Sequence, residues 1–349
     1  MKLKNTIFSR AICILFILVL LFLSGCQTSG SKQPISLTTF QLNTVITITI
    51  YDSQDQQLLQ ECEKLCQKYE QIFSRTSPES ELYKLNHGEL EDKDGVSHIS
   101  KELAELIQES LKYAELSQGA FDPTIGPVSS LWDFTGENPQ VPDAKELQQK
   151  LPLVDYRQVQ LNGQEIRFLQ PEMQLDLGAI AKGYIADRLK DYLEGQGVTS
   201  ATINLGGNVL CVGKHTGGNP FSVGIQKPFA QRNEVLLSVD VDDLSVVSSG
   251  IYERYFESNG TLYHHILNPK TGMPYDNGLI SVSILSSTSV EGDGLSTACF
   301  SPRPKDGIAL LDSLEGVCGV FVDEKWRTAL FRRFSYFRII EVEQSLIKF

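Results

Sequence analysis

Asp293 and Thr297 stand four residues apart in the segment GDGLSTACF, residues 292–300, and offer a carboxylate and a hydroxyl. Residues at this spacing lie on one face of a helix. Two interpretations fit the segment. In the first, Asp293 caps a helix that begins here, because Asp is among the best N-cap residues. In the second, the two side chains converge on a ligand, and the two roles are not exclusive.

A second group of candidates surrounds the segment LDLGAIAKG, which is typical of a strand that feeds a helix. The free N–H groups and the positive end of the dipole at such a helix start favour phosphate, and Lys182 adds a charge. The spacing is not that of a P-loop. The alternative is a tight, closely packed turn around Gly178 with no ligand.

Two further segments end strands in small residues, Gly206-Gly207 and Ser248-Ser249-Gly250. Such residues let a ligand approach backbone N–H groups, but hairpin turns use the same residues. In the segment HHILNPKTGMP, a strand runs into a rigid turn. His264 and His265 should point to opposite faces of that strand, so at most one faces a site.

The hydrophobic pattern predicts the elements that position these residues. Strands are expected over 40–51 and through most of the second half, with hairpins at Asn162-Gly163 and Asn259-Gly260. Helices are expected over 54–73, from Ser100 to Gly119, over 179–193 and from GDGLSTACF onward. Few helices and many hairpin-linked strands predict an α+β fold with mixed, mostly antiparallel sheets and flanking helices.

The ends of the chain differ from its body. Residues 1–25 form a basic, then apolar segment typical of a signal peptide, too short to span a bilayer, and they end at a lipobox-like LSGC with Cys26 as the expected lipid anchor. Removing that segment changes the formal charge from −12 to −15, which argues against a nucleic-acid partner. Residues 26–38 are expected to be a polar tether, 39–325 the catalytic domain, and 326–349 a basic, aromatic tail of unknown role.

Eight segments, taken in order, resemble the ApbE family, the Mg-dependent FAD:protein FMN transferases. They are SPESELYKLN, GAFDPTIGPVSSLWDF, LDLGAIAKGYIAD, INLGGNV, SVGIQKP, VVSSGIYERYF, HHILNPKTGMP and SVSILSSTSVEGDGLSTACF. The resemblance implies an ApbE-like fold with an elongated FAD cleft. It also implies transfer of FMN from FAD to a threonine hydroxyl of an acceptor protein, with release of AMP.

The resemblance assigns roles to individual residues. Asp293, Thr297 and the backbone carbonyl of Ala179 are expected to bind Mg²⁺, and His265 and Asp293 to act in catalysis, with His265 near the transferred phosphate. The residues expected to bind FAD are Asp122, Thr124, Lys182, Gly206, Gly207, Asn208, Ser249, Gly250 and His265. Family members commonly carry Asp where this chain has Asn268, so no catalytic role is expected there.

These expectations define the partners and the alternatives. The partners are FAD and an acceptor flavoprotein of respiratory or extracellular electron transfer, met on the extracytoplasmic face of the cell membrane. The same metal site would also serve a FAD pyrophosphatase that forms FMN and AMP. A third alternative is a lipoprotein that binds FAD without turnover.

Overall fold

The structure is a computed structural model. It describes residues 33–339 except 232–233, 326 and 332–337. The predicted signal segment and Cys26 lie outside the described residues. Residues 34–349 belong to one structural unit. Among the described residues, no helix has the length and apolar character needed to cross a membrane.

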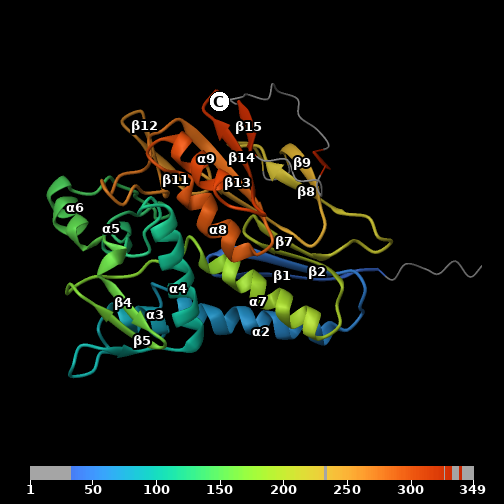
Figure 1. The fold of residues 1–349 in the computed structure, drawn as a ribbon, viewed down its shortest axis with the longest axis horizontal. Coiled ribbons are helices and arrows are strands. Elements are labelled where there is room, and N and C mark those ends of the chain that lie inside the picture. Colours follow the sequence, from blue (N-terminus) through green and yellow to red (C-terminus); the bar gives the residue numbers. More distant parts are fainter. Residues whose placement is uncertain (1–32, 232–233, 326, 332–337, 340–349) are drawn as a thin grey trace, which may run out of the picture. The chain divides into compact units, whose positions relative to one another are not determined.

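An eight-stranded antiparallel sheet is the frame of the fold (Figure 1). Its order is β1-β2-β6-β7-β10-β13-β14-β15. The strands span Ile35–Gln41 (β1), Thr44–Ile50 (β2), Ser200–Leu205 (β6), Asn208–Gly213 (β7), Ser245–Gly250 (β10), Leu279–Ser286 (β13), Cys318–Asp323 (β14) and Thr328–Phe331 (β15). All of these neighbours pair antiparallel, as the hairpin-rich sequence predicts.

The single strand predicted over 40–51 is wrong. The chain turns at Leu42 and Asn43, so that β1 and β2 form a hairpin. Both turn residues have a positive φ, 55° and 54°, a conformation that is usually signalled by glycine. Because no glycine marks this turn, the β-branched residues of Thr44–Ile50 led to the prediction of one continuous strand.

The folded unit extends beyond the predicted domain boundaries at both ends. From Ile35 onward the predicted tether, residues 26–38, belongs to the sheet as β1. The predicted tail begins at residue 326, yet β15 pairs with β14 as the edge strand of the same sheet. The strand β16, Arg338–Ile339, pairs with β9. The first strand of the sheet, β1, therefore begins before residue 39, and its last strand, β15, lies wholly beyond residue 325.

The two faces of the sheet are covered by different layers. Along β10, Val246 packs into the cluster formed with β8 and β9, whereas the neighbouring Val247 contacts helix α8. Along β13, Leu285 and Ile284 divide in the same way between two hydrophobic cores. This alternation follows from the two-residue period of a strand. A three-stranded sheet in the order β16-β9-β8 forms the layer on the Val246 side, with β8 at Phe221–Gln226 and β9 at Val235–Val241.

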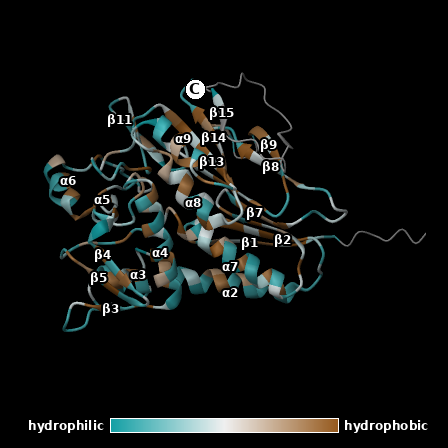
Figure 2. Cartoon of the chain, in the orientation of Figure 1, coloured by the Kyte–Doolittle hydropathy of each residue, from teal (hydrophilic) through white to brown (hydrophobic). Residues whose placement is uncertain are grey.

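Four helices form the other layer, and hydrophobic residues concentrate on their inner sides and on the strands (Figure 2). They are α2 (Gln56–Phe73), α4 (Lys101–Leu116), α7 (Ala181–Gly195) and α8 (Ser289–Ala298). Asp55 and Ser100 cap α2 and α4 through their side-chain oxygens, so the predicted starts of these helices are accurate to within two residues. Gly119, with a φ of 77°, follows α4.

The remaining elements are short. The helices are α3 (Glu81–Asn86), α5 (Gly126–Ser129), α6 (Ala144–Lys150) and α9 (Pro304–Asp312), with 3₁₀ turns at Leu151–Leu153 and Tyr156–Gln158. A small sheet joins β3 (Ser97–His98), β5 (Glu165–Phe168) and β4 (Val159–Asn162), and β11 (Tyr255–Ser258) pairs with β12 (Thr261–His264). Both predicted hairpins, β4–β5 and β11–β12, are confirmed.

Candidate functional site

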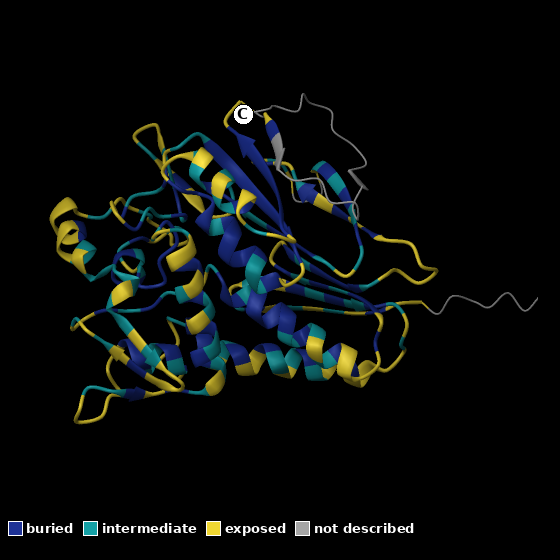
Figure 3. Cartoon of the chain, viewed as in Figure 1, coloured by how far each residue is buried: buried dark blue, intermediate teal, exposed yellow. Residues whose placement is uncertain are grey.

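Helix α8 is an unusual carrier of polar residues because most of it is buried (Figure 3). Its glycines permit this close packing. A Cβ at Gly292 would lie 2.5 Å from the Val247 side chain of β10, and one at Gly294 would lie 2.5 Å from the Tyr113 ring of α4. The sequence GDGLSTA therefore places Asp293 between the sheet and the helices, where its carboxylate is only 4% exposed.

Asp293 does not cap its own helix, so the local cap interpretation is wrong. Helix α8 begins at Ser289 with Thr288 as its N-cap, four residues before Asp293. Instead, the Gly183 N–H, in the first turn of α7, donates to Asp293 Oδ2 over 2.6 Å. Asp293 therefore caps the start of α7 instead of its own helix, and its partner Gly183 lies 110 residues earlier in the chain.

Helix α7 caps α8 in return. The Asp187 carboxylate accepts hydrogen bonds from the backbone N–H groups of Ser289, at 2.7 Å, and Val290, at 2.9 Å. Gly183 makes the approach possible, because a Cβ there would lie 2.3 Å from the Ser289 carbonyl oxygen. The two helix starts are therefore locked together by two carboxylates. Sequence analysis missed Asp187, although its segment was recognised.

The turn that precedes α7 leaves oxygens available beside Asp293. Because Gly183 donates to Asp293, no backbone N–H of the described chain donates to the Ala179 carbonyl. The Asn208 side chain also interacts with the Asp293 carboxylate. The Lys182 ammonium lies 3.8 Å from Oδ2. Burial raises the pKa of Asp293, opposed by Lys182, by the Gly183 N–H and by the Asn208 side chain.

Thr297 lies one turn further along the same face of α8, as its spacing predicts. Its hydroxyl oxygen is 3.5 Å from Ser249 Oγ of β10, which is 2.8 Å from Ser296 Oγ. Asn208, at the start of β7, is tied to this region because the Ser289 hydroxyl donates to its side-chain oxygen. Its Nδ2 is buried and makes no hydrogen bond of normal geometry within the described residues, but it lies near enough to the Asp293 carboxylate to lower the pKa of that group. The structure therefore brings Thr297, Ser249 and Asn208 together around α8.

The Gly206-Gly207 pair forms the two-residue turn between β6 and β7, with φ values of 62° and 95°. The hairpin interpretation of this pair is therefore correct. A Cβ at Gly206 would lie 2.1 Å from Thr44 Oγ1, so this glycine also lets the turn approach the β1–β2 hairpin. The turn positions Asn208, the next residue, at the site.

The two adjacent histidines have different environments, as the strand period predicts. His264 is buried, with Nδ1 accepting from the Ile266 N–H and Nε2 donating to the Tyr275 carbonyl. Burial lowers its pKa to about 4. Both nitrogens are occupied, so His264 has a structural role.

His265 is half-buried, and its Nδ1 lies 3.3 Å from the Arg254 carbonyl oxygen. A carbonyl only accepts, so Nδ1 carries the proton and Nε2 keeps its lone pair. Desolvation, followed by the Arg254 cation and with a further contribution from Lys182, lowers the pKa of His265 to about 3. The imidazole is therefore neutral at pH 7, and the Lys182 ammonium lies within electrostatic range of it.

The side chains of Asp122 and Thr124 are turned inward. The Asp122 carboxylate accepts from the Thr124 N–H, the Thr124 hydroxyl and the Tyr156 N–H, and Thr124 is fully buried. Burial raises the pKa of Asp122, and these hydrogen bonds oppose that effect. Their side chains therefore shape the loop, and their role toward FAD stays a prediction.

That loop contacts the segment leading to α7. The Asp176 N–H donates to the Pro123 carbonyl over 2.8 Å. The Asp176 carboxylate is half-buried, lies 3.3 Å from Arg75 and accepts from the Ser129 hydroxyl at 2.7 Å. Sequence analysis did not select Asp176 or Arg75, because their partners are distant in sequence.

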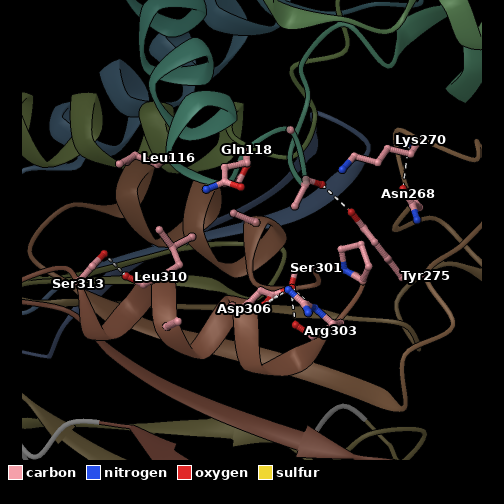
Figure 4. A pocket seen from close by; sticks show the side chains of 17 residues that line it. Leu116, Gln118, Asn268, Lys270, Tyr275, Ser301, Arg303, Asp306, Leu310 and Ser313 are labelled. Atoms are coloured by element: carbon pink, nitrogen blue, oxygen red, sulfur yellow. Dashed lines mark hydrogen bonds and ion pairs between the residues drawn. The ribbon is translucent and has the colours of Figure 1, made fainter.

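A separate pocket of about 660 Å³ lies between the end of α4, the turn at Asn268 and α9 (Figure 4). It contains none of the predicted site residues. The Asn268 side chain accepts from the Lys270 N–H and so stabilises a turn.

No group of three or more His, Cys, Asp or Glu side chains suited to a metal ion occurs within the described ranges. A cation here would rest on one carboxylate plus hydroxyl and carbonyl oxygens. That set suits Mg²⁺, which keeps several waters or phosphate oxygens in its shell. The Asp293 carboxylate, the Thr297 hydroxyl and the Ala179 carbonyl offer oxygens of these three kinds.

The model of the ApbE family matches residues 42–321. The chain belongs to the ApbE family. A FAD:protein FMN transferase of Klebsiella pneumoniae (strain 342) is 38% identical over 272 residues, covering 77% of this chain and 83% of that protein. One from Treponema pallidum (strain Nichols) is 36% identical over 279 residues, covering 76% of each chain.

Solved structures show the same fold. The ApbE protein of Thermotoga maritima superimposes with a TM-score of 0.77 at 30% identity, covering 86% of this chain and 97% of that one. The flavin transferase ApbE from Vibrio cholerae gives a TM-score of 0.75 at 23% identity, covering 89% and 97%. The predicted ApbE-like α+β fold is thus confirmed.

Proposed function

We propose that this protein is a Mg²⁺-dependent FAD:protein FMN transferase, which moves FMN from FAD to a threonine hydroxyl of an acceptor protein and releases AMP. The observation that carries the proposal is the junction of α7 and α8. There, the buried Asp293 carboxylate lies beside Lys182, and no backbone N–H of the described residues donates to the Ala179 carbonyl. The Klebsiella pneumoniae and Treponema pallidum relatives are named FAD:protein FMN transferases.

Asp293, Thr297 and the Ala179 carbonyl are the proposed Mg²⁺ ligands. When bound, Mg²⁺ would neutralise part of the charge on the pyrophosphate of FAD. The Lys182 ammonium adds a second positive charge next to the buried carboxylate. This compensation is needed because the protein has a formal net charge of −12, and an acidic body repels a pyrophosphate.

His265 is the proposed general base. Its Nε2 lone pair takes the proton of the threonine hydroxyl while the threonine oxygen forms a bond to the phosphorus of the FMN moiety. The bond from that phosphorus to the bridging oxygen breaks, and AMP leaves with the oxygen. The histidine can act from pH 5 upward because its pKa is lowered to about 3.

The test compares wild type with Asp293→Ala, using FAD, Mg²⁺ and several candidate acceptors. Covalent flavin fluorescence on an acceptor band is expected for wild type and should disappear in the variant. Asp191→Ala, which removes an exposed carboxylate from α7, is the matched control. Equal transfer by Asp293→Ala would refute the metal assignment. FMN and AMP formed without any protein labelling would identify a pyrophosphatase, and intact FAD would identify a binding protein.

We also propose that the mature protein is anchored by lipid on Cys26 to the extracytoplasmic face of the cell membrane. The acceptor would then be a flavoprotein of respiratory or extracellular electron transfer. The proposal is supported by the apolar segment, the LSGC sequence and the polar residues that follow. Cys26→Ser should move the protein from the membrane fraction to the soluble fraction, and an unchanged distribution would refute the anchor.

A further inference from the structure

Ser289, the first residue of α8, is fully buried and forms hydrogen bonds in three directions. Its backbone N–H donates to Asp187, which already caps the helix. Its hydroxyl donates to the side-chain oxygen of Asn208 on β7, and its hydroxyl oxygen lies 2.8 Å from the Ser245 hydroxyl of β10. A buried hydroxyl is costly unless partners satisfy it. Because the Ser289 hydroxyl is not needed as a cap, these contacts indicate another task.

The directions of the protons in this network follow from its acceptors. An amide oxygen only accepts, so Ser289 uses its single hydroxyl proton on Asn208, and its oxygen then accepts from Ser245. The Asn208 amide is thereby oriented, with Oδ1 toward Ser289. The reverse orientation would turn the amide oxygen toward the Asp293 carboxylate, so that two acceptors would face each other.

The nitrogen of the oriented amide lies beside the proposed metal ligand. Asn208 is only 2% exposed, and its Nδ2 makes no hydrogen bond of normal geometry within the described residues, yet it lowers the pKa of Asp293. On the α7 side, the Gly183 N–H donates to Asp293 Oδ2. N–H donors that surround a carboxylate fix the direction of its remaining lone pairs. An amide free to rotate would lose this effect, because its oxygen could replace its nitrogen.

We propose that Ser289 and Ser245 are positioning residues, which hold the Asn208 amide with its nitrogen toward Asp293 so that the carboxylate is oriented for a cation. The inference rests on the proposed function, because the cation is the Mg²⁺ proposed there. Groups that orient metal ligands typically contribute about 10–100-fold to metal affinity. The two serines are not ligands themselves and act through Asn208.

The test measures the Kd for Mn²⁺, a paramagnetic probe of the Mg²⁺ site, from the electron paramagnetic resonance signal of the free ion with full-length protein in detergent. Ser289→Ala should weaken Mn²⁺ binding about tenfold, and Ser245→Ala should weaken it less. Ser289→Ala keeps the backbone N–H that donates to Asp187, so the start of α8 stays capped. Ser110→Ala is the matched control and should leave the Kd unchanged. Ser110 is equally buried, and its hydroxyl donates to the Leu106 carbonyl within α4.

A double variant separates positioning from a general loss of stability. Asn208→Ala should weaken Mn²⁺ binding at least as much as Ser289→Ala does. Adding Ser289→Ala to Asn208→Ala should then change the Kd by less than about twofold, because the serine acts through the amide. Additive losses would overturn the proposal, since Ser289 would then act by another route. Unchanged Mn²⁺ binding in Ser289→Ala would also overturn it.

The outcomes distinguish this proposal from the proposed function. Suppose that the variants lose Mn²⁺ affinity as expected, but wild type with FAD and acceptors forms only FMN and AMP. Transfer to a protein would then be wrong, while the positioning role of the serines would be confirmed. If wild type binds no Mn²⁺, the proposed metal site is wrong and the positioning role is overturned with it.

Discussion

The Asp187→Asn substitution should remove a specific part of the pH dependence of stability. Burial is the main cause that raises the pKa of Asp187 from 3.8 to about 6, and the N–H groups of Ser289 and Val290 oppose it. A carboxyl whose pKa is raised on folding stabilises the native state fully below the unfolded pKa. That contribution disappears as the pH rises through the folded pKa.

The magnitude follows from the size of the shift. About two pKa units correspond to about 3 kcal/mol in the free energy of unfolding. About 2 kcal/mol of this loss in the free energy of unfolding occurs between pH 4.5 and 7.5, because most of the remainder occurs below pH 4.5. Asparagine does not ionise, so the wild type should lose that amount relative to Asp187→Asn across this interval. Asparagine also has a single acceptor oxygen, so one of the two N–H groups that fix the start of α8 loses its partner.

The measurement is urea unfolding of residues 27–349 at half-unit steps from pH 4.5 to 7.5. Asp191→Asn, an exposed substitution on the same helix, controls for the loss of one negative charge. FMN transfer by Asp187→Asn, assayed in parallel, should fall because α8 carries Asp293. Parallel stability curves for wild type and Asp187→Asn would refute the raised pKa, and unimpaired transfer would refute the positioning role.

Four other outcomes are expected. Gly183→Ala places a Cβ 2.3 Å from the Ser289 carbonyl and should destabilise the fold by about 1–3 kcal/mol in urea unfolding; full stability would contradict the close packing of α7 and α8. The pKa of His265 is lowered to about 3, so the pH profile of kcat for wild-type transfer should show no step near pH 6.5 that comes from this histidine. A step near pH 6.5 that is present in wild type and absent from His265→Gln would contradict the lowered pKa. Lys182→Met should weaken FAD binding about tenfold by flavin fluorescence, with partial recovery in Lys182→Arg; unchanged binding would exclude a contact with the pyrophosphate. The five buried cysteines of residues 27–349 should react with a thiol reagent only after unfolding.

Local signals in the sequence predicted the fold well where the responsible residues are contiguous. Asp55 and Ser100 cap their helices through neighbouring N–H groups, and Asn259-Gly260 forms the turn of its hairpin. The β1–β2 turn at Leu42 and Asn43 was missed because it reaches a positive φ without glycine. The sequence therefore specifies local geometry when the usual turn chemistry is present.

The candidate site could be predicted only in part, because its contacts join distant segments. The side-chain types of Asp293 and Thr297 and their spacing indicated a shared helix face, and that is where they lie. The hydrogen bond from Gly183 to Asp293 and those from Ser289 and Val290 to Asp187 cross about a hundred residues of chain. No local pattern encodes such pairs, so the site needed the tertiary structure.

The position of Asp293 also revises how the pyrophosphate can be held. The sequence suggested that the free N–H groups at the start of α7 bind phosphate, yet the Gly183 N–H is occupied by Asp293. The dipole of α7 already stabilises the Asp293 carboxylate. The charge of the FAD pyrophosphate must therefore be compensated by other groups, and Lys182 and a cation bound to Asp293 can supply that compensation. Oδ2 of Asp293 fixes the two helices against each other, and in the proposed function the same carboxylate also binds the metal. The segment alone suggested that Asp293 caps its own helix, binds a ligand, or does both. In the folded chain it caps α7 instead of α8, and this role is compatible with the proposed metal site.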